Sequence, residues 1–193
     1  MLQKLVHNRN LILASQSPRR SFFLKELGLD FEIRVKEIEE SYPTQLKGKE
    51  ISEYLARLKA AAFLNDLQIK DILITADTIV WLDGKALGKP KNKAEAFHML
   101  SSLSESVHEV ISSVALTTNK NQVVFSDSTE VIFKKLSQDE INFYIDNFEP
   151  FDKAGSYGIQ EWIGYIGIKK IHGSYFNVMG FPVQKFYEAL LKI

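Results

Sequence analysis

The sequence predicts an α/β protein built on a mixed, twisted sheet flanked by helices. Three observations carry this prediction. Strand and helix patterns alternate through the first half, two long β-rich runs follow across a short turn, and no repeat or linker divides the 193 residues. Because 45% of the residues are apolar and 11% are aromatic, the chain has enough material for a sizeable core. We therefore expect a single domain over residues 1–193.

The first half of the chain alternates between apolar runs and helical patterns. We expect strands at 11–15, 31–35 and 72–82, and helices at 18–27 and 51–67. The pair Asp83-Gly84 after the third strand is a strong signal for a two-residue hairpin turn. This turn pairs Leu82 with Lys85 and, further along, sets Thr78 opposite Lys89.

The second half is dominated by a long hairpin. After a helix at 94–103, strands are expected at 108–118 and 123–133, joined by a turn at 119–121. Ser137 and Glu140 form the capping-box pattern of a helix at 137–147. Strand-like segments and a helix at 182–191 follow. The antiparallel hairpin makes the predicted sheet mixed.

Charge and composition exclude several classes of function. The 24 basic residues balance the 24 acidic ones, so the overall charge favours neither nucleic acid nor an anionic membrane as partner. No cysteine is present, which excludes disulfides, thiolate metal sites and thiol nucleophiles. No apolar run approaches the length of a membrane span. We expect a soluble, cytoplasmic protein whose affinity for phosphate is local.

The stretch SQSPRR, residues 15–20, is a candidate anion site. Ser17 is a good N-cap and Pro18 a good first helical residue, so backbone N–H groups and the positive end of the helix dipole meet two arginines. Helix starts after strands bind phosphate, and the arginine fork of Arg19 or Arg20 adds bidentate contacts. The alternative is a capped helix with a solvated basic first turn, although basic residues there oppose the dipole.

Asp77 interrupts an otherwise apolar strand. A buried carboxylate is costly without a partner, so Asp77 needs a metal, another cation or a proton, or it marks the end of the buried stretch. The hairpin register returns Lys89 beside Asp77, although ideal alternation would put it on the opposite face. The alternative for Lys89 is a surface position.

Lys59 and the acidic stretch EIEE, residues 37–40, extend this candidate site. Lys59 lies at the edge of the apolar stripe of the 51–67 helix, where it either extends to solvent or points into a cleft. The acidic residues follow the second strand in a loop, where such residues are usually solvated. If one met Asp77 across a cleft, the two carboxylates would suit Mg²⁺ or Mn²⁺ bridging to substrate phosphates.

The segment DKAGSYGIQ, residues 152–160, combines two glycines with an aromatic and an amide side chain. Tyr157 and Gln160 suit stacking on, or hydrogen bonding to, a nucleotide base, and a tight structural turn is the alternative. The four histidines lack ligand spacing, and neither a P-loop nor a nucleophile-elbow motif is present.

Seven segments, taken in order, are similar to motifs of the Maf family of nucleoside triphosphate pyrophosphatases. They are SQSPRR, EIEE, ARLKA, ADTIV, LGKP, DKAGSYGIQ and GSYFNVMGFP, and they span nearly the whole chain. The resemblance implies an elongated, two-lobed fold like that of inosine triphosphate pyrophosphatases, with a central cleft, and a homodimer is frequent in that family. It also implies hydrolysis of a phosphoanhydride bond with Mg²⁺ or Mn²⁺ as cofactor.

The resemblance also assigns roles to single residues. It implies that Asp77 is the proton acceptor and a metal ligand, with Glu39 as the second acidic ligand. The implied phosphate-binding residues are Ser15, Arg19, Arg20, Lys59 and Lys89, the two lysines also stabilising charge during the reaction. The implied substrate-selecting residues are Arg19, Thr78 and Gln160. The DKAGSYGIQ form is similar to the branch acting on dTTP and UTP, which yields a nucleoside monophosphate and pyrophosphate.

Several positions depart from the family pattern. Glu161-Trp162 stands where a glycine often follows the glutamine, Ser104-Glu105 replaces a common Ser-Gly, and Phe181 replaces a usual leucine. Glu161 and Trp162 adjoin the expected base reader, so they are expected to affect the substrate range. Two other functions stay open: a non-catalytic nucleotide binder connected with septum formation, and a purine pyrophosphatase of the inosine triphosphate type.

Overall fold

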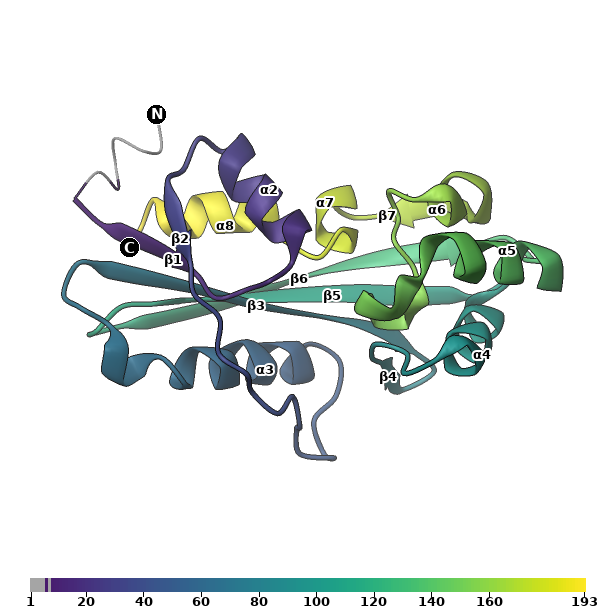
Figure 1. Cartoon of the computed structure of the whole chain (residues 1–193), viewed down its shortest axis with the longest axis horizontal. Coiled ribbons are helices and arrows are strands. Elements are labelled where there is room, and N and C mark those ends of the chain that lie inside the picture. Colours follow the sequence, from purple (N-terminus) through teal and green to yellow (C-terminus); the bar gives the residue numbers. More distant parts are fainter. Residues whose placement is uncertain (1–5, 7) are drawn as a thin grey trace.

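The computed structural model describes residue 6 and residues 8–193. In this part of the chain the strands form one seven-stranded sheet in the order β2-β1-β3-β5-β6-β7, with β4 paired to β3 (Figure 1). The strands are β1 (Asn10–Leu13), β2 (Phe31–Ile33), β3 (Asp71–Leu82), β4 (Lys85–Leu87), β5 (Val107–Thr117), β6 (Gln122–Phe133) and β7 (Ile168–His172). β1 runs parallel to β2 and β3, whereas the other pairs are antiparallel. The predicted mixed sheet is confirmed.

Helices cover both faces of the sheet and its far end. They are α2 (Pro18–Glu26), α3 (Lys49–Ala61), α4 (Lys93–Leu103), α5 (Gln138–Phe148), α6 (Trp162–Gly167), α7 (Tyr175–Val178) and α8 (Val183–Leu190). Three short 3-10 turns accompany them: η1 (Leu64–Asp66), η2 (Pro150–Asp152) and η3 (Ala154–Ser156). Figure 1 shows α3 on one side of the long strands and α2 with α8 on the other, in an elongated molecule. No helix of the described residues is both long and apolar enough to cross a membrane.

Two large apolar clusters divide the molecule along β3. The first packs α2 and α8 against the sheet, and its members include Leu13, Phe23, Ile74, Phe181 and Phe186. The second packs α4, α5 and α6, and its members include Val80, Leu100, Phe133, Ile141 and Ile163. β3 contributes Ile72, Ile74 and Ala76 to the first cluster and Val80 and Leu82 to the second. Each cluster is the core of one lobe of the molecule. Thr78 lies on the same face of β3 between the two clusters, so it marks the place where the two lobes meet.

The predicted 51–67 helix is too long at its C-terminal end, since α3 stops at Ala61. The Lys36 ammonium donates to the carbonyl oxygen of Ala62 at 2.7 Å and pairs with Asp66 at 2.5 Å. This contact satisfies a carbonyl at the helix end, and Asn65 and Asp66 are poor helix formers. The strands predicted at 11–15 and 31–35 also end early, at Leu13 and Ile33.

Other local predictions hold, with one qualification. The capping box of Ser137 and Glu140 is present at the start of α5, and Leu82 pairs with Lys85 across the predicted hairpin turn. Ser17 occupies the N-cap of α2, yet its side chain accepts no hydrogen bond from the helix. Its backbone N–H donates instead to Ser15 Oγ at 3.2 Å. The short elements α6, α7, η2 and η3 were not predicted, because they are too short to show a periodic pattern.

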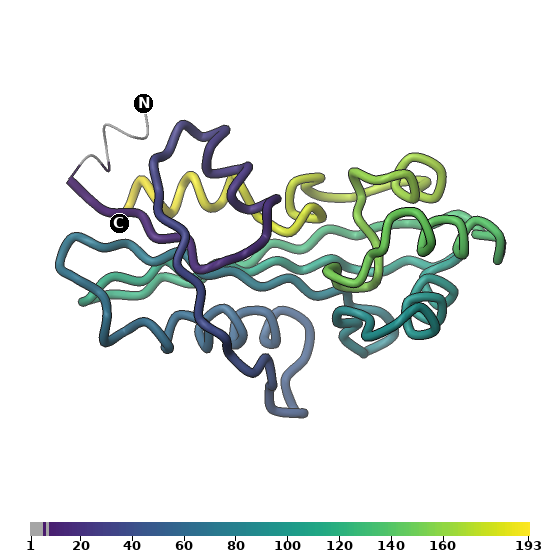
Figure 2. The backbone as a smooth tube through the Cα atoms, viewed as in Figure 1, coloured from purple at the N-terminus to yellow at the C-terminus, as the bar shows by residue number. Residues whose placement is uncertain are grey.

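The chain between β2 and α3 connects the two sides of the sheet. Figure 2 shows it passing from the α2 side to the α3 side before it turns into α3. This passage carries the acidic stretch 37–40 past the middle of the molecule, near the part of β3 that holds Asp77.

Candidate active site

The site lies at a gap along one edge of β3. On this edge β1 pairs with residues 71–74 and β4 with residues 80–82, whereas β5 occupies the other edge without a break. Residues 75–79 therefore have a strand partner on one edge only. A cavity of about 910 Å³ opens at this gap, and both Asp77 and Thr78 line it. Since side chains alternate along a strand, Asp77 faces α3 and Thr78 faces α2.

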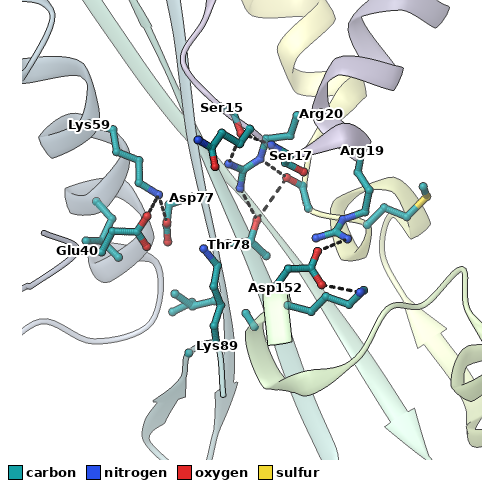
Figure 3. Close-up of a pocket in the computed structure, with 18 of the residues that line it drawn as sticks. Ser15, Ser17, Arg19, Arg20, Glu40, Lys59, Asp77, Thr78, Lys89 and Asp152 are labelled. Atoms are coloured by element: carbon teal, nitrogen blue, oxygen red, sulfur yellow. Dashed lines mark hydrogen bonds and ion pairs between the residues drawn. The ribbon is translucent and has the colours of Figure 1, made fainter. Parts of the chain in front are cut away.

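The side chain of Arg20 binds the edge of β3 in the gap between β1 and β4. Its Nη1 donates to the carbonyl oxygen of Ala76 at 2.9 Å and to Ser15 Oγ at 3.3 Å. Its Nη2 donates to Thr78 Oγ1 at 3.3 Å, and its Nε donates to the carbonyl oxygen of Gly180 at 3.2 Å. Because a guanidinium has five N–H donors, most of them are engaged by the protein. Arg20 thus fixes Ser15 and Thr78 at the cavity wall (Figure 3).

Asp77 has the cationic partner that its buried position demands. The Lys59 ammonium lies 2.7 Å from Asp77 Oδ1 and 2.9 Å from Glu40 Oε1. Only 8% of the Asp77 side chain and 14% of the Lys59 side chain are exposed, against 42% for Glu40. Of the alternatives open for Lys59, the structure has it pointing into the cleft, and Figure 3 shows the two carboxylates converging on its ammonium group.

Burial and charge set the protonation of the two carboxylates. Burial raises the pKa of Asp77, and the charge and hydrogen bond of Lys59 oppose this rise without cancelling it. Burial has the same tendency at Glu40, but there Lys59, Lys89 and Arg20 prevail and hold the pKa below its usual value. Asp77 is therefore the stronger proton acceptor of the two.

The acidic stretch brings Glu40, rather than Glu39, to the cavity. Glu37, Ile38 and Glu40 line it, whereas Glu39 is exposed and is not among the lining residues. One signal in the sequence favours Glu40. Alternate side chains of an extended segment lie on the same side, so Glu40 lies on the same side as Ile38, which is apolar and therefore expected to face inward. Glu40 was missed because the family resemblance pointed to its neighbour.

Arg19 and Lys89 approach the cavity from opposite lobes. Arg19 Nη1 pairs with Asp152 Oδ2 at 3.2 Å, and Asp152 Oδ1 pairs with Lys153 Nζ at 2.6 Å. The β3–β4 pairing stops at Leu87, so strand alternation no longer governs Lys89, and Figure 3 shows its ammonium pointing toward Asp77. Asp152 and Lys153 line the cavity and were not predicted, since nothing in their spacing distinguishes them from a solvated pair.

Eight of the nine predicted site residues line this one cavity. They are Ser15, Arg19, Arg20, Lys59, Asp77, Thr78, Lys89 and Gln160. Gln160 stands on the wall formed by the 152–160 segment, and its side-chain Oε1 is buried with no hydrogen-bond partner among the described residues. The chemical roles expected of these residues stay predictions.

Comparison with known proteins decides the family. The model of the family described as Maf-like protein matches residues 10–193. The chain belongs to the Maf family. Curated relatives match it over nearly their whole length. A Flavobacterium psychrophilum protein is 56% identical over 191 residues, covering 99% of this chain and 98% of its own. A Phocaeicola vulgatus protein is 53% identical over 194 residues, with both chains fully covered. Both are named dTTP/UTP pyrophosphatase.

Two solved structures are distantly similar to this Maf chain. The Staphylococcus aureus Ham1 protein has a TM-score of 0.49 and 16% identity, covering 65% of this chain and 72% of that one. A Mycobacterium abscessus protein described as a nucleoside-triphosphatase or dITP/XTP pyrophosphatase has a TM-score of 0.44 and 16% identity, covering 93% and 92%. The family assignment does not depend on either.

Proposed function

We propose that this protein is a hydrolase that converts dTTP and UTP to the nucleoside monophosphate and pyrophosphate. The proposal rests on one observation: a single cavity brings the carboxylates of Asp77 and Glu40 together with the cationic side chains of Lys59 and Lys89. The full-length Maf relatives named dTTP/UTP pyrophosphatase support the substrate and the reaction. A protein that only binds nucleotides would have no need of a costly buried carboxylate at position 77.

The phosphate chain would lie between the start of α2 and the hairpin that carries Lys89. The side chain of Ser17 accepts no hydrogen bond from α2, so the first backbone N–H groups of this helix are free to donate to a phosphate oxygen of the substrate. Arg19 donates one hydrogen bond to Asp152 and keeps other N–H groups for the substrate. Lys59 and Lys89 supply positive charge on the opposite side of the cavity. Arg20 contributes mainly by holding Ser15 and Thr78 in place.

The reaction needs a water molecule, a proton acceptor and stabilisation of the leaving group. In our proposal a water attacks the α-phosphorus and Asp77 accepts its proton, which the raised pKa of this carboxyl favours. The bond between the α-phosphorus and the α–β bridging oxygen breaks, and its electron pair leaves with pyrophosphate. Lys59 and Lys89 stabilise the charge that develops on the phosphate oxygens. No covalent intermediate with the enzyme is required.

Asp77 and Glu40 are the residues suited to hold the Mg²⁺ or Mn²⁺ that the resemblance implies. Their oxygens converge on one cation, the Lys59 ammonium, and this supports the proposal that both carboxylates can face a single positive charge. Among the described residues no group of three or more acidic, histidine or cysteine side chains forms a metal site. Two carboxylates suit Mg²⁺, which usually keeps waters and binds substrate phosphates as its other ligands. When bound, the ion would neutralise phosphate charge.

Gln160 is the residue best suited to read the base. A buried amide oxygen without a donor is costly, so we expect it to gain one when the site is filled. Uracil and thymine carry their N–H donor at N3, whereas cytosine has an acceptor at N3 and its donor on the exocyclic N4. An amide oxygen held opposite N3 would therefore favour uracil and thymine. Thr78, fixed by Arg20 and by Ser112 at 2.9 Å, provides a rigid neighbour for the substrate. This chemistry supports a preference for dTTP and UTP over CTP.

The test is turnover of dTTP, UTP, CTP, ITP and 7-methyl-GTP with Mg²⁺ or Mn²⁺, with the products identified by phosphorus NMR. We expect pyrophosphate and monophosphate from dTTP and UTP. A preference for ITP or 7-methyl-GTP would keep the reaction but overturn the base assignment, and binding without any turnover would favour the regulatory binder. A cytoplasmic location and a homodimer remain predictions.

A further inference from the structure

A chain of polar contacts connects the base side of the cavity to its phosphate side. It begins in α5, where the Tyr144 hydroxyl donates to Glu161 Oε2. Glu161 Oε1 pairs with Lys153 Nζ at 3.1 Å, and Lys153 pairs with Asp152 at 2.6 Å. Asp152 in turn pairs with Arg19 of α2 at 3.2 Å. The chain therefore starts beside the segment that carries Gln160 and ends on an arginine at the helix start.

The carboxylate of Glu161 packs against the segment that carries Gln160. Glu161 occupies the N-cap of α6, but its side chain makes no capping hydrogen bond to that helix. The backbone N–H of Gly158 donates to the Tyr144 hydroxyl at 3.0 Å. A Cβ atom at Gly158 would lie 2.8 Å from Glu161 Cδ, so only glycine lets the carboxylate approach this closely. The carbonyl oxygen of Gln160 is bound by the Tyr165 hydroxyl at 2.8 Å.

Of the two carboxylates that pair with Lys153, Glu161 is the less exposed. The side chain of Lys153 is only 9% exposed, and a buried ammonium needs carboxylate partners. Its two partners differ, since 56% of the Asp152 side chain is exposed but only 20% of the Glu161 side chain. Burial raises the pKa of Tyr144, with the Glu161 hydrogen bond adding to the rise, so the hydroxyl stays a donor. The Lys153–Glu161 pair is longer, at 3.1 Å against 2.6 Å for Lys153–Asp152, but it is better shielded from solvent and is therefore screened less.

We propose that Glu161 is a positioning residue for base selection. Its carboxylate, held between Tyr144 and Lys153, sets the place of residues 158–160 and so aligns the Gln160 side chain with the base. Glu161 also holds Lys153, which pairs with Asp152, and Asp152 pairs with Arg19. The residue that positions the base reader is therefore connected to an arginine that binds phosphate. This inference rests on the proposed hydrolysis of pyrimidine nucleoside triphosphates.

The test compares Glu161→Gln with the natural protein on UTP and CTP. The substitution keeps the size of the side chain but removes one of the two negative charges that pair with Lys153. We expect KM for UTP to rise roughly tenfold and the UTP over CTP ratio of kcat/KM to fall by a similar factor, as for the loss of one charged hydrogen bond. The kcat for UTP should stay within about threefold, because the reacting groups are untouched.

Glu140→Gln is the matched control. Glu140 also pairs with a lysine, Lys134, at 2.6 Å, and belongs to the capping box of α5. It should lower the melting temperature without changing the UTP over CTP ratio. An unchanged KM and ratio in Glu161→Gln, or an equal loss of kcat on both nucleotides, would overturn the inference. If the natural protein hydrolyses neither dTTP nor UTP, the proposed function itself fails. Should Glu161→Gln not fold, Tyr144→Phe carries the test with the same criteria.

Discussion

At the scale of single residues, the site is organised by the requirement that buried charges be paired. Asp77 interrupts an apolar strand, and the sequence alone predicted that it needs a cation, a metal or a proton. Lys59 supplies the cation, at 2.7 Å. The helical pattern alone could not decide whether Lys59 extends to solvent or points into a cleft, because a place at the edge of an apolar stripe suits both.

Glu40 and Glu39 give a test within two adjacent residues. Since Glu40 contacts Lys59 at 2.9 Å and Glu39 is exposed, Glu40→Gln should lower kcat/KM for dTTP about 100-fold or more, the usual effect of removing a group that stabilises the transition state. Glu39→Gln should stay within about threefold of the natural rate. Steady-state kinetics at saturating Mg²⁺ provides the measurement. The reverse order would restore Glu39 as the acidic ligand.

His108 should make the stability of the fold depend on pH. It lies buried on β5 with Nε2 2.8 Å from the Tyr157 hydroxyl, and burial lowers its pKa to about 4. In the unfolded chain this imidazole takes up a proton near pH 6.5, whereas in the folded protein it does so only near pH 4. The part of the folding stability that depends on neutral His108 is therefore fully present above pH 6.5 and is lost as the pH falls toward 4. The loss amounts to about 3 kcal/mol. Urea unfolding at pH 7.5 and 4.5 should show a smaller loss in His108→Gln, and equal losses in both proteins would contradict it.

At the scale of secondary-structure elements, the site exists because β1 and β4 pair with different parts of the same edge of β3 and leave residues 75–79 between them unpaired on that edge. The register of the β3–β4 hairpin was predictable, since Asp83-Gly84 fixes the turn. The position of Lys89 was not, because it depends on where pairing stops rather than on alternation. Likewise the early end of α3 depends on Lys36, which comes from a distant segment.

The planar shape of the Arg20 guanidinium, as well as its charge, should stabilise the fold around the gap in β3. Arg20→Lys keeps the positive charge but loses the planar fork that reaches Ser15, Ala76 and Thr78. We expect a loss of about 3 kcal/mol in the free energy of unfolding, as for one or two charged hydrogen bonds. Arg19→Lys is the control, because Arg19 makes a single pair with a carboxylate that is mostly exposed. Equal melting temperatures for the two variants would refute this role of Arg20.

At the scale of the whole molecule, the cavity forms between two apolar clusters and draws its residues from segments far apart in the sequence. The element pattern predicted the mixed sheet, and the seven ordered segments predicted eight of the lining residues. Pattern alone did not predict which neighbours meet, such as Asp152 with Arg19 or Tyr144 with Glu161. The first contact joins the two lobes and the second joins α5 to the residue before α6 within one lobe, so both depend on tertiary packing between segments distant in the sequence.

In the proposed reaction Asp77 accepts a proton during hydrolysis of dTTP and UTP. The most direct measurement is pyrophosphate release by the natural protein and by Asp77→Asn, at equal concentrations of folded protein verified by circular dichroism. Because an amide cannot accept the proton, we predict a loss of roughly 10²–10⁴-fold in kcat on both nucleotides, with each still bound. A folded Asp77→Asn protein that releases pyrophosphate at the natural rate would show that Asp77 is not the proton acceptor.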